Sequence, residues 1–161
     1  MSAGEKGANT VFRGIHSINM DAKGRMSVPA RFRDQLLSVC EGQVVVTIDP
    51  NTKNLAMYPL SRWEEIQAKI EALPSINPQA RRLQQLFIGH ASDLDMDGNG
   101  RILVPPMLRR YAELEKRLIL LGQGQKIEIW SEALWETRFQ DIQNMSDGLE
   151  ELPEEMRSLS Y

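Results

Sequence analysis

The chain has 161 residues, of which 42% are hydrophobic and 25% are charged, a composition typical of a soluble globular protein. No apolar run approaches the roughly 20 residues that a membrane helix needs, and the N-terminus lacks the apolar core of a signal peptide. The single cysteine, Cys40, excludes an intrachain disulfide and fits a reducing compartment. No membrane partner is therefore expected.

The formal net charge is −3, but the charges are unevenly distributed. Residues 11–33 carry five basic side chains and one acidic side chain, a net charge of +4. Residues 141–161 carry six acidic side chains and one basic side chain, a net charge of −5. A basic segment can form the electrostatic surface that nucleic acid needs. Charge runs also occur on ordinary solvated surfaces, so this distribution alone does not decide the function.

A first strand is expected at residues 11–20. It leads into Asp21-Ala-Lys-Gly24-Arg25, a turn in which Asp can bond the backbone two residues on and Gly can take a positive φ. The short apolar and β-branched run at 26–28 predicts a second strand. Pro29 ends this strand because proline cannot donate to the ladder, and a short helix is expected from residue 30 to 37.

Two β-hairpins, each followed by a helix, are expected further along. Ser61 and Glu64 have the spacing of a capping box, and Asn77 followed by Pro78 predicts the start of a further helix. The expected elements are strands 44–48 and 55–58 with a helix at 61–73, and strands 118–121 and 127–130 with a helix that Ser131 caps.

The chain contains an internal repeat. Asp97-Gly-Asn-Gly100-Arg101 lies 76 residues after the first turn and is followed by the same strand–proline–helix pattern. Tyr58 and Trp63 correspond to Trp130 and Trp135 with an offset of 72, and these aromatic residues are expected to pack in the core. A duplication of this kind predicts two structural halves. The expected segments are a disordered leader at 1–10, a first half at 11–73, a linker with a helix at 74–92, a second half at 93–144 and an acidic tail at 145–161.

The sequence contains no recognisable catalytic constellation, so no enzyme activity, cofactor or small-molecule substrate is expected. The two histidines, His16 and His90, and the lone cysteine do not have the spacing of a metal site. Residues 93–98 match the opening of a calcium loop, but Val104 stands where the bidentate Glu belongs. A calcium-binding or purely structural interaction module stays open as an alternative, and it predicts metal-dependent melting.

The repeated turn resembles that of the MraZ family of bacterial transcriptional regulators, tandem relatives of the AbrB and MazE swapped-hairpin DNA-binding domains. The resemblance rests on Asp-x-x-Gly-Arg-x-x-x-Pro at 21–29 and 97–105, on Phe12-Arg13-Gly14, and on Gly89-His90-Ala91. It implies a mainly β fold with flanking helices (α+β), in which the two halves form a swapped-hairpin, AbrB-like double-split β-barrel within one chain. It also implies a ring-like homo-oligomer.

The resemblance further implies a repressor of the cell-division and cell-wall operon that is cytoplasmic and nucleoid-associated. Its partners would be a second copy of itself and double-stranded DNA containing spaced promoter repeats. By position, Arg25 and Arg101 are the expected DNA-contacting residues, with Lys23 beside the first. The second copy has Asn99 at the position of Lys23, so the two halves would not contribute equally to DNA binding.

Physical chemistry agrees with this expectation. A turn arginine can make a bidentate contact to guanine in the major groove. Lys23, Arg13, Arg31 and Arg33 would contact phosphates, which position a protein without specifying a sequence. Occupancy of the promoter would exclude polymerase without any chemistry. An antitoxin that wraps a toxin with its acidic tail is the other open alternative, although the second copy of the motif argues against it.

Overall fold

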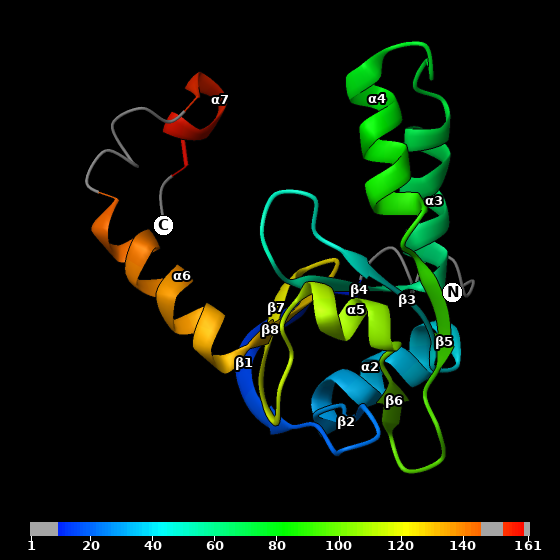
Figure 1. Cartoon of the computed structure of the whole chain (residues 1–161), viewed down its shortest axis with the longest axis vertical. Helices are drawn as coiled ribbons and strands as arrows, with labels where there is room; N and C mark the ends of the chain where they lie inside the picture. Colours follow the sequence, from blue (N-terminus) through cyan, green and yellow to red (C-terminus); the bar gives the residue numbers. More distant parts are fainter. Residues whose placement is uncertain (1–9, 146–152, 160–161) are drawn as a thin grey trace.

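Six antiparallel strands form one sheet in the structure, a computed structural model that describes residues 10–145 and 153–159 (Figure 1). The strand order is β1-β7-β8-β4-β3-β5, and a separate two-stranded sheet pairs β2 with β6. Residues 1–9 of the expected leader, and residues 146–152 and 160–161 of the expected acidic tail, lie outside the described residues. The strands are β1 (Phe12–Asn19), β2 (Arg25–Ser27), β3 (Gln43–Ile48), β4 (Leu55–Pro59), β5 (Ser92–Asp95), β6 (Arg101–Leu103), β7 (Arg117–Gly124) and β8 (Ile127–Ser131).

Helices pack beside the sheet and also project from it. Figure 1 shows α2 and α5 close to the strands, whereas α3 with α4 and, on the other side, α6 extend outward as two arms. The α+β class is confirmed, and the sheet is open, with β1 and β5 as its edges. The helices are α2 (Ala30–Cys40), α3 (Leu60–Glu71), α4 (Pro78–Leu83), the π-helical turn η1 (Gln84–Ile88), α5 (Pro106–Tyr111), α6 (Glu132–Asn144) and α7 (Glu154–Arg157).

The two halves exchange their opening strands. β1, from the first half, pairs along its whole length with β7 of the second half, from Phe12 opposite Gly124 to Asn19 opposite Arg117. β5, from the second half, pairs with β3 of the first half. Each hairpin therefore receives its third strand from the other half, and neither half completes its part of the sheet alone.

A pseudo-two-fold axis relates the halves. On β2 and β6, Met26 lies opposite Ile102, which is its own equivalent at the 76-residue offset. On β4 and β8, Ala56 lies opposite Glu128, its equivalent at the 72-residue offset. A residue can pair with its own equivalent only on the symmetry axis, so both offsets found in the sequence identify the same axis.

The main core lies between the sheet and the β2–β6 ribbon. Met26 and Ile102 are fully buried at the centre of the ribbon, and Phe32 of α2 packs edge-on against Phe12 of β1 with ring centroids 5.8 Å apart. Burial of these side chains is the main stabilising term for such a fold. The ribbon is thus seated on a rigid base made by both halves.

A second, smaller core lies under the first arm. Trp63 of α3 contacts Phe87 of η1 with ring centroids 5.0 Å apart, and Tyr58 of β4 lies beside both rings. The Thr47 hydroxyl donates a 2.6 Å hydrogen bond to the Phe87 carbonyl. Helix α4 and the π-helical turn η1 therefore cover α3. The expected core position of Tyr58 and Trp63 is confirmed.

In the second half, α6 has no buried residue within the part of the chain that the structure describes. Trp130 is buried, but Trp135 of α6 is only half-buried, and Phe139 stacks on it in an exposed position with ring centroids 5.9 Å apart. The expectation that Trp135 lies in the core is therefore wrong for a single protomer. The reason is that α6, within the described residues, packs mainly against β7 and β8, whereas α3 also packs against η1.

Two of the three helix caps expected from the sequence are present. Asn77 caps α4 by accepting a bond from the Gln79 backbone N–H, and the Ser131 hydroxyl caps α6 in the same way, as expected. The prediction of a Ser61–Glu64 capping box is wrong. Helix α3 begins one residue earlier than expected, after Pro59, and no side chain caps it. Among the described residues, no helix is long and apolar enough to cross a membrane.

Candidate nucleic-acid interface

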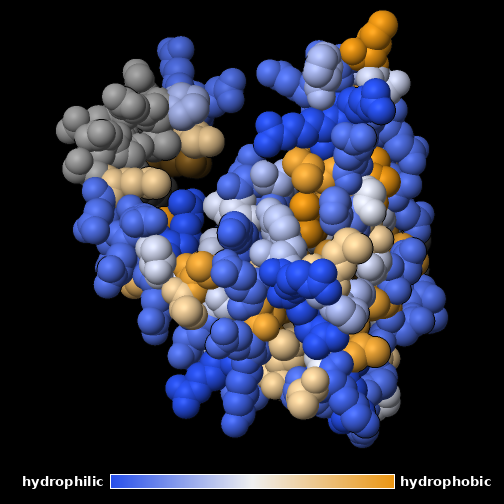
Figure 2. Space-filling model, viewed as in Figure 1, coloured by the Kyte–Doolittle hydropathy of each residue, from blue (hydrophilic) through white to orange (hydrophobic). Residues whose placement is uncertain are grey.

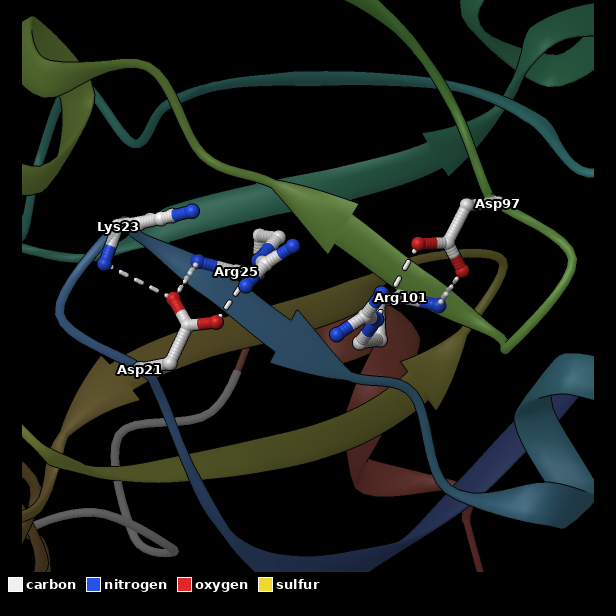
Figure 3. A network of polar contacts seen from close by, with 5 residues as sticks. All are labelled: Asp21, Lys23, Arg25, Asp97 and Arg101. Atoms are coloured by element: carbon white, nitrogen blue, oxygen red, sulfur yellow. Dashed lines mark hydrogen bonds and ion pairs between the residues drawn. The ribbon is translucent and has the colours of Figure 1, made fainter.

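Two turns of the same geometry precede β2 and β6 (Figure 3). In the first, one carboxylate oxygen of Asp21 accepts hydrogen bonds from the backbone N–H groups of Lys23 (3.0 Å) and Arg25 (2.9 Å). The other oxygen accepts a 2.8 Å bond from Nε of Arg25. One aspartate therefore shapes the turn and also holds the arginine that follows it.

The second turn repeats this arrangement. Asp97 accepts 2.9 Å bonds from the backbone N–H groups of Asn99 and Arg101, and its second oxygen lies 3.2 Å from Nε of Arg101. The sequence predicted the bond from each aspartate to the backbone two residues on, at Lys23 and Asn99. It did not predict their contact with the arginine side chains, although the spacing of four residues between Asp and Arg is a signal that could have indicated it.

The two arginines lie on the outer face of the ribbon. Because side chains alternate along a strand, Met26 and Ile102 point into the core while Arg25 and Arg101 point outward. Figure 3 shows the two Asp–Arg pairs side by side on β2 and β6. Ser27 lies opposite Arg101 in the ribbon and shares this face.

Each guanidinium keeps two donor groups available. Within the residues that the structure describes, Arg25 and Arg101 use only Nε in their side-chain bonds, each to its own aspartate. The terminal amino groups have no protein partner there and remain partly exposed. An arginine held through Nε presents these terminal groups as a fixed pair of donors, the arrangement that a bidentate acceptor requires.

The hydrogen bonds of the two turns lower the pKa values of both aspartates. The bond from the Arg25 backbone N–H, with its side-chain bond, holds the pKa of Asp21 below the ordinary value of 3.8. The Arg101 backbone N–H does the same for the pKa of Asp97. Both turns therefore keep their charge-assisted hydrogen bonds throughout the physiological pH range.

Each turn is also clamped by an arginine from the other half. Arg109 of α5 lies over Gly24, and Arg33 of α2 lies over Gly100. The two glycines have φ of 91° and 73°, and a Cβ on either would come within 2.6 Å of the arginine above it. Both positions require glycine, because glycine adopts a positive φ without strain and has no Cβ to collide with the arginine.

The remaining basic residues lie in different places. Lys23 is exposed in the first turn, beside Arg25 (Figure 3). Arg33 is half-buried in its packing on Gly100. Arg13 and Arg31 are exposed and line one shallow depression together with an acidic residue, Asp34. Arg13 is near the far end of β1, about 20 Å along the strand from its junction with the ribbon.

No metal site was found in the described part of the chain, where no group of three or more His, Cys, Asp or Glu side chains could hold an ion. Residues 92–95 form the extended strand β5, whereas a calcium loop would have to curve around the ion. Asp97 is occupied by its bonds to Arg101. The structure thus uses the acidic run at 93–97 as a strand and a turn.

These features define a class of protein: a tandem duplication whose halves exchange strands around a pseudo-dyad, with a paired Asp–Gly–Arg ribbon on the axis. Comparisons with known proteins agree. The family described as "MraZ protein, putative antitoxin-like" matches twice, at residues 11–86 and 87–156. The chain belongs to the MraZ family.

Several curated relatives are similar over nearly their whole length, and each is named "Transcriptional regulator MraZ". The protein from Halorhodospira halophila is 54% identical over 151 residues, covering 93% of this chain and 99% of the relative. The protein from a Marinomonas species is 54% identical over 145 residues, covering 90% and 95%. The protein from Pseudomonas aeruginosa strain LESB58 is 48% identical over 149 residues, covering 92% and 99%.

Proposed function

We propose that the chain is a transcriptional regulator that binds DNA through the outer face of the β2–β6 ribbon. The observation that supports this most directly is the pair of arginines, each held through Nε by its own aspartate on one exposed face. The names of the relatives support regulation of transcription. The major groove, about 12 Å wide, admits a two-stranded ribbon.

In this proposal, Arg25 and Arg101 recognise bases. The terminal amino groups of an arginine match O6 and N7 of guanine, and one such contact discriminates against the wrong base by roughly 1–3 kcal/mol. Because the aspartates fix the side chains before binding, less side-chain entropy is lost in the complex. Asp21 and Asp97 are therefore positioning residues, and they do not contact DNA themselves.

Other basic residues would contact the phosphates. Lys23 lies beside Arg25, and its exposed side chain can reach the sugar–phosphate backbone of the DNA. Arg33 packs against Gly100, so its main role in this proposal is to hold the second turn, with phosphate contact through its outer edge. Arg13 of β1 and Arg31 of α2 line one depression, and they would meet DNA only if it extends beyond the ribbon.

The regulated DNA, in this proposal, is the promoter of the cell-division and cell-wall operon, and the protein acts as a repressor. Bound protein would cover promoter repeats and exclude polymerase. The exchange of strands β1 and β5 supports the view that the fold is a swapped-hairpin barrel of the AbrB type, formed by two halves of one chain instead of two chains.

The second arm supports self-association. Ile70 of α3 is 9% exposed under η1, but its equivalent on α6, Ile142, is 43% exposed. Together with Trp135 and Phe139, Ile142 forms an apolar stripe at helical spacing, 3 and 4 residues apart. A stripe of this kind on a single protomer marks a contact surface.

The proposed occupant of this stripe is the α3–α4 arm of a second copy. α6 carries three acidic residues and one basic residue, whereas α4 carries Arg81 and Arg82, which form no ion pair within the described residues. Ile76, at the tip of the arm, is 92% exposed, and Figure 2 shows hydrophobic residues at that tip. Two different surfaces would meet, and such head-to-tail contacts close into rings.

Fluorescence anisotropy tests the DNA-binding proposal. Wild type, Arg25→Ala and Arg101→Ala are titrated on labelled DNA from upstream of the operon, against a shuffled sequence and across a salt series. Lys53→Ala, which removes one positive charge from the exposed loop between β3 and β4, is the matched control. Each phosphate contact should contribute about −0.9 to the slope of log affinity against log salt.

We expect each arginine variant to lose roughly 5-fold to 150-fold of its affinity for the operon sequence, with little loss on shuffled DNA. Lys53→Ala should bind both DNAs like the wild type. Unchanged sequence preference in both arginine variants would place the recognition surface elsewhere. Absence of any salt-dependent DNA binding by the wild type would refute the proposal.

A further inference from the structure

The two ends of the ribbon differ in one outward-facing residue. Leu103 of β6 is 54% exposed, although both of its neighbours, Ile102 and Val104, are fully buried. The equivalent position on β2 is Ser27. A single exposed leucine is common on protein surfaces, so exposure alone decides nothing. The position of Leu103 within the ribbon is what gives it significance.

Leu103 lies directly opposite Arg25. The Val28 N–H donates to the Gly100 carbonyl, and the Val104 N–H donates to the Gly24 carbonyl. These bonds mark hydrogen-bonded pairs at the two ends of the ribbon, and three pairs lie between them. Because the two kinds of pair alternate, Met26 with Ile102 is a hydrogen-bonded pair, whereas Arg25 with Leu103 and Ser27 with Arg101 are non-hydrogen-bonded pairs. Side chains approach most closely in such pairs, with Cα atoms about 4.5 Å apart.

The ribbon therefore has two chemically different ends. One end carries Lys23, Arg25 and the apolar side chain of Leu103. The other end carries Asn99, Arg101 and the hydroxyl of Ser27. The arginines are equivalent and are held in the same way, so any difference in what the two ends recognise must come from the residues beside them.

We infer that Leu103 contacts the 5-methyl group of a thymine next to the guanine that Arg25 recognises. This inference rests on the proposed DNA-binding function. The thymine methyl is the apolar group that base edges present in the major groove, and apolar side chains contact it. Successive bases on a strand are about 3.4 Å apart, which is close to the separation of the two side chains in a non-hydrogen-bonded pair.

Serine at the other end recognises bases differently. The Ser27 hydroxyl can donate to or accept from either kind of base, so Arg101 has no methyl-sensing neighbour. Leu103 is in this way a specificity-determining residue that acts at one end only. The preferred sequence contains guanine at both ends of the contacted site and a methyl-dependent thymine at the Arg25 end.

The test replaces thymine by uracil, which removes only the methyl group. A duplex is first selected from a random-sequence library with the wild-type protein, and each thymine in it is then replaced singly. Affinities are measured by anisotropy for wild type, Leu103→Ser, which copies the other end of the ribbon, and Leu103→Met, which keeps an apolar side chain. Circular dichroism checks that all three are folded.

We expect one uracil substitution to weaken wild-type binding about threefold to fivefold, the value for one buried methyl-sized group. The same substitution should not affect Leu103→Ser, and Leu103→Met should retain most of the dependence. Ser27→Leu should make binding sensitive to a thymine at the Arg101 end.

Two outcomes contradict the inference, and they can be told apart. If the wild type selects a sequence but no uracil substitution distinguishes it from Leu103→Ser, the DNA-binding proposal survives and the role of Leu103 is refuted. If no sequence is selected and binding is the same on all DNA, the proposed function itself fails and the inference fails with it.

Discussion

Arg109 of the second half lies directly over Gly24 of the first, so close that a Cβ on residue 24 would come within 2.6 Å of the guanidinium carbon. Its Nε also donates a 3.0 Å bond to the Val104 carbonyl. The turn that presents Arg25 is therefore held by a side chain that comes from the opposite half of the chain.

Gly24→Ala should lower the free energy of unfolding by about 1–3 kcal/mol, because alanine is strained at this positive φ and Arg109 must move away. Urea unfolding measures the change. Gly98→Ala is the matched control, since Gly98 has open space around its Cα, and it should change stability by no more than about 0.5 kcal/mol. Equal effects of the two substitutions would contradict this account of the clamp.

The aspartate turns should make the protein sensitive to acid. The pKa values of Asp21 and Asp97 are lowered in the folded state, first by the backbone N–H of the following arginine. Their stabilising contribution is therefore fully present above the unfolded value of 3.8 and is lost as the pH falls through the folded values. Unfolding free energies measured between pH 6 and pH 2 should decline below about pH 4.

Asp21→Asn should show a shallower acid decline than the wild type, because the amide keeps an acceptor oxygen for the backbone but does not titrate. The second aspartate continues to titrate in this variant, so part of the decline should remain. The double variant, Asp21→Asn with Asp97→Asn, should show a still shallower acid decline of the unfolding free energy. Identical pH profiles for all three proteins would show that the carboxylates do not couple to folding.

Ile102→Ala should be much more destabilising than Leu103→Ala, although the two residues are neighbours on β6. Ile102 is fully buried on the pseudo-dyad, and truncation of a buried isoleucine costs about 2–5 kcal/mol. Leu103 is exposed, so its truncation should cost less than about 0.5 kcal/mol. Chemical unfolding of both variants gives the comparison, and a large loss in Leu103→Ala would mean that this side chain is covered in solution.

Phe139→Asp should reduce the size of the assembly. It places a charge in the centre of the apolar stripe on α6, where desolvation of the carboxylate in a contact would be unfavourable. Sedimentation velocity at several protein concentrations measures the shift toward the monomer. Gln140→Asp introduces the same charge at an exposed neighbouring position on the helix and should leave the sedimentation coefficient unchanged.

If Phe139→Asp sediments like the wild type, the stripe is not the contact surface. A complementary variant, Arg81→Glu, should weaken assembly if α4 meets the acidic helix α6 of the next copy. Combining Arg81→Glu with Glu136→Arg should restore part of the association, because the two charges are exchanged.

The local elements could be predicted from sequence because their signals are local. The repeated turn, the two hairpins, and the caps at Asn77 and Ser131 each depend on residues within a few positions of one another. The offsets of 76 and 72 also locate the symmetry axis, since each offset relates two residues that pair with each other on that axis. The α3 capping box failed because Pro59 already occupies the capping position.

The partners of β1 and β5 could not be predicted from pattern alone. Which strand pairs with β1 depends on contacts between residues more than 90 positions apart, and alternation of side chains does not specify a partner. The crossing of Arg33 onto Gly100 and the position of Leu103 opposite Arg25 depend in the same way on the long-range pairing of β2 with β6. At the candidate site, the arginines were predicted, and their contacts with Asp21 and Asp97 are local in sequence. The arginines that clamp the turns, and Leu103 beside Arg25, depend on tertiary structure.

The exchange of strands also ties folding to the completion of synthesis. β1 is made early, but its partner β7 ends at Gly124, so β1 stays unpaired until about a hundred further residues have been added. At the usual rates of translation, this wait lasts roughly 5 to 20 s. Throughout that time the nascent chain exposes an unpaired strand containing Ile15, a situation that favours aggregation or capture by chaperones. The topology that gives the folded protein a core shared by both halves therefore leaves the incomplete nascent chain prone to aggregation.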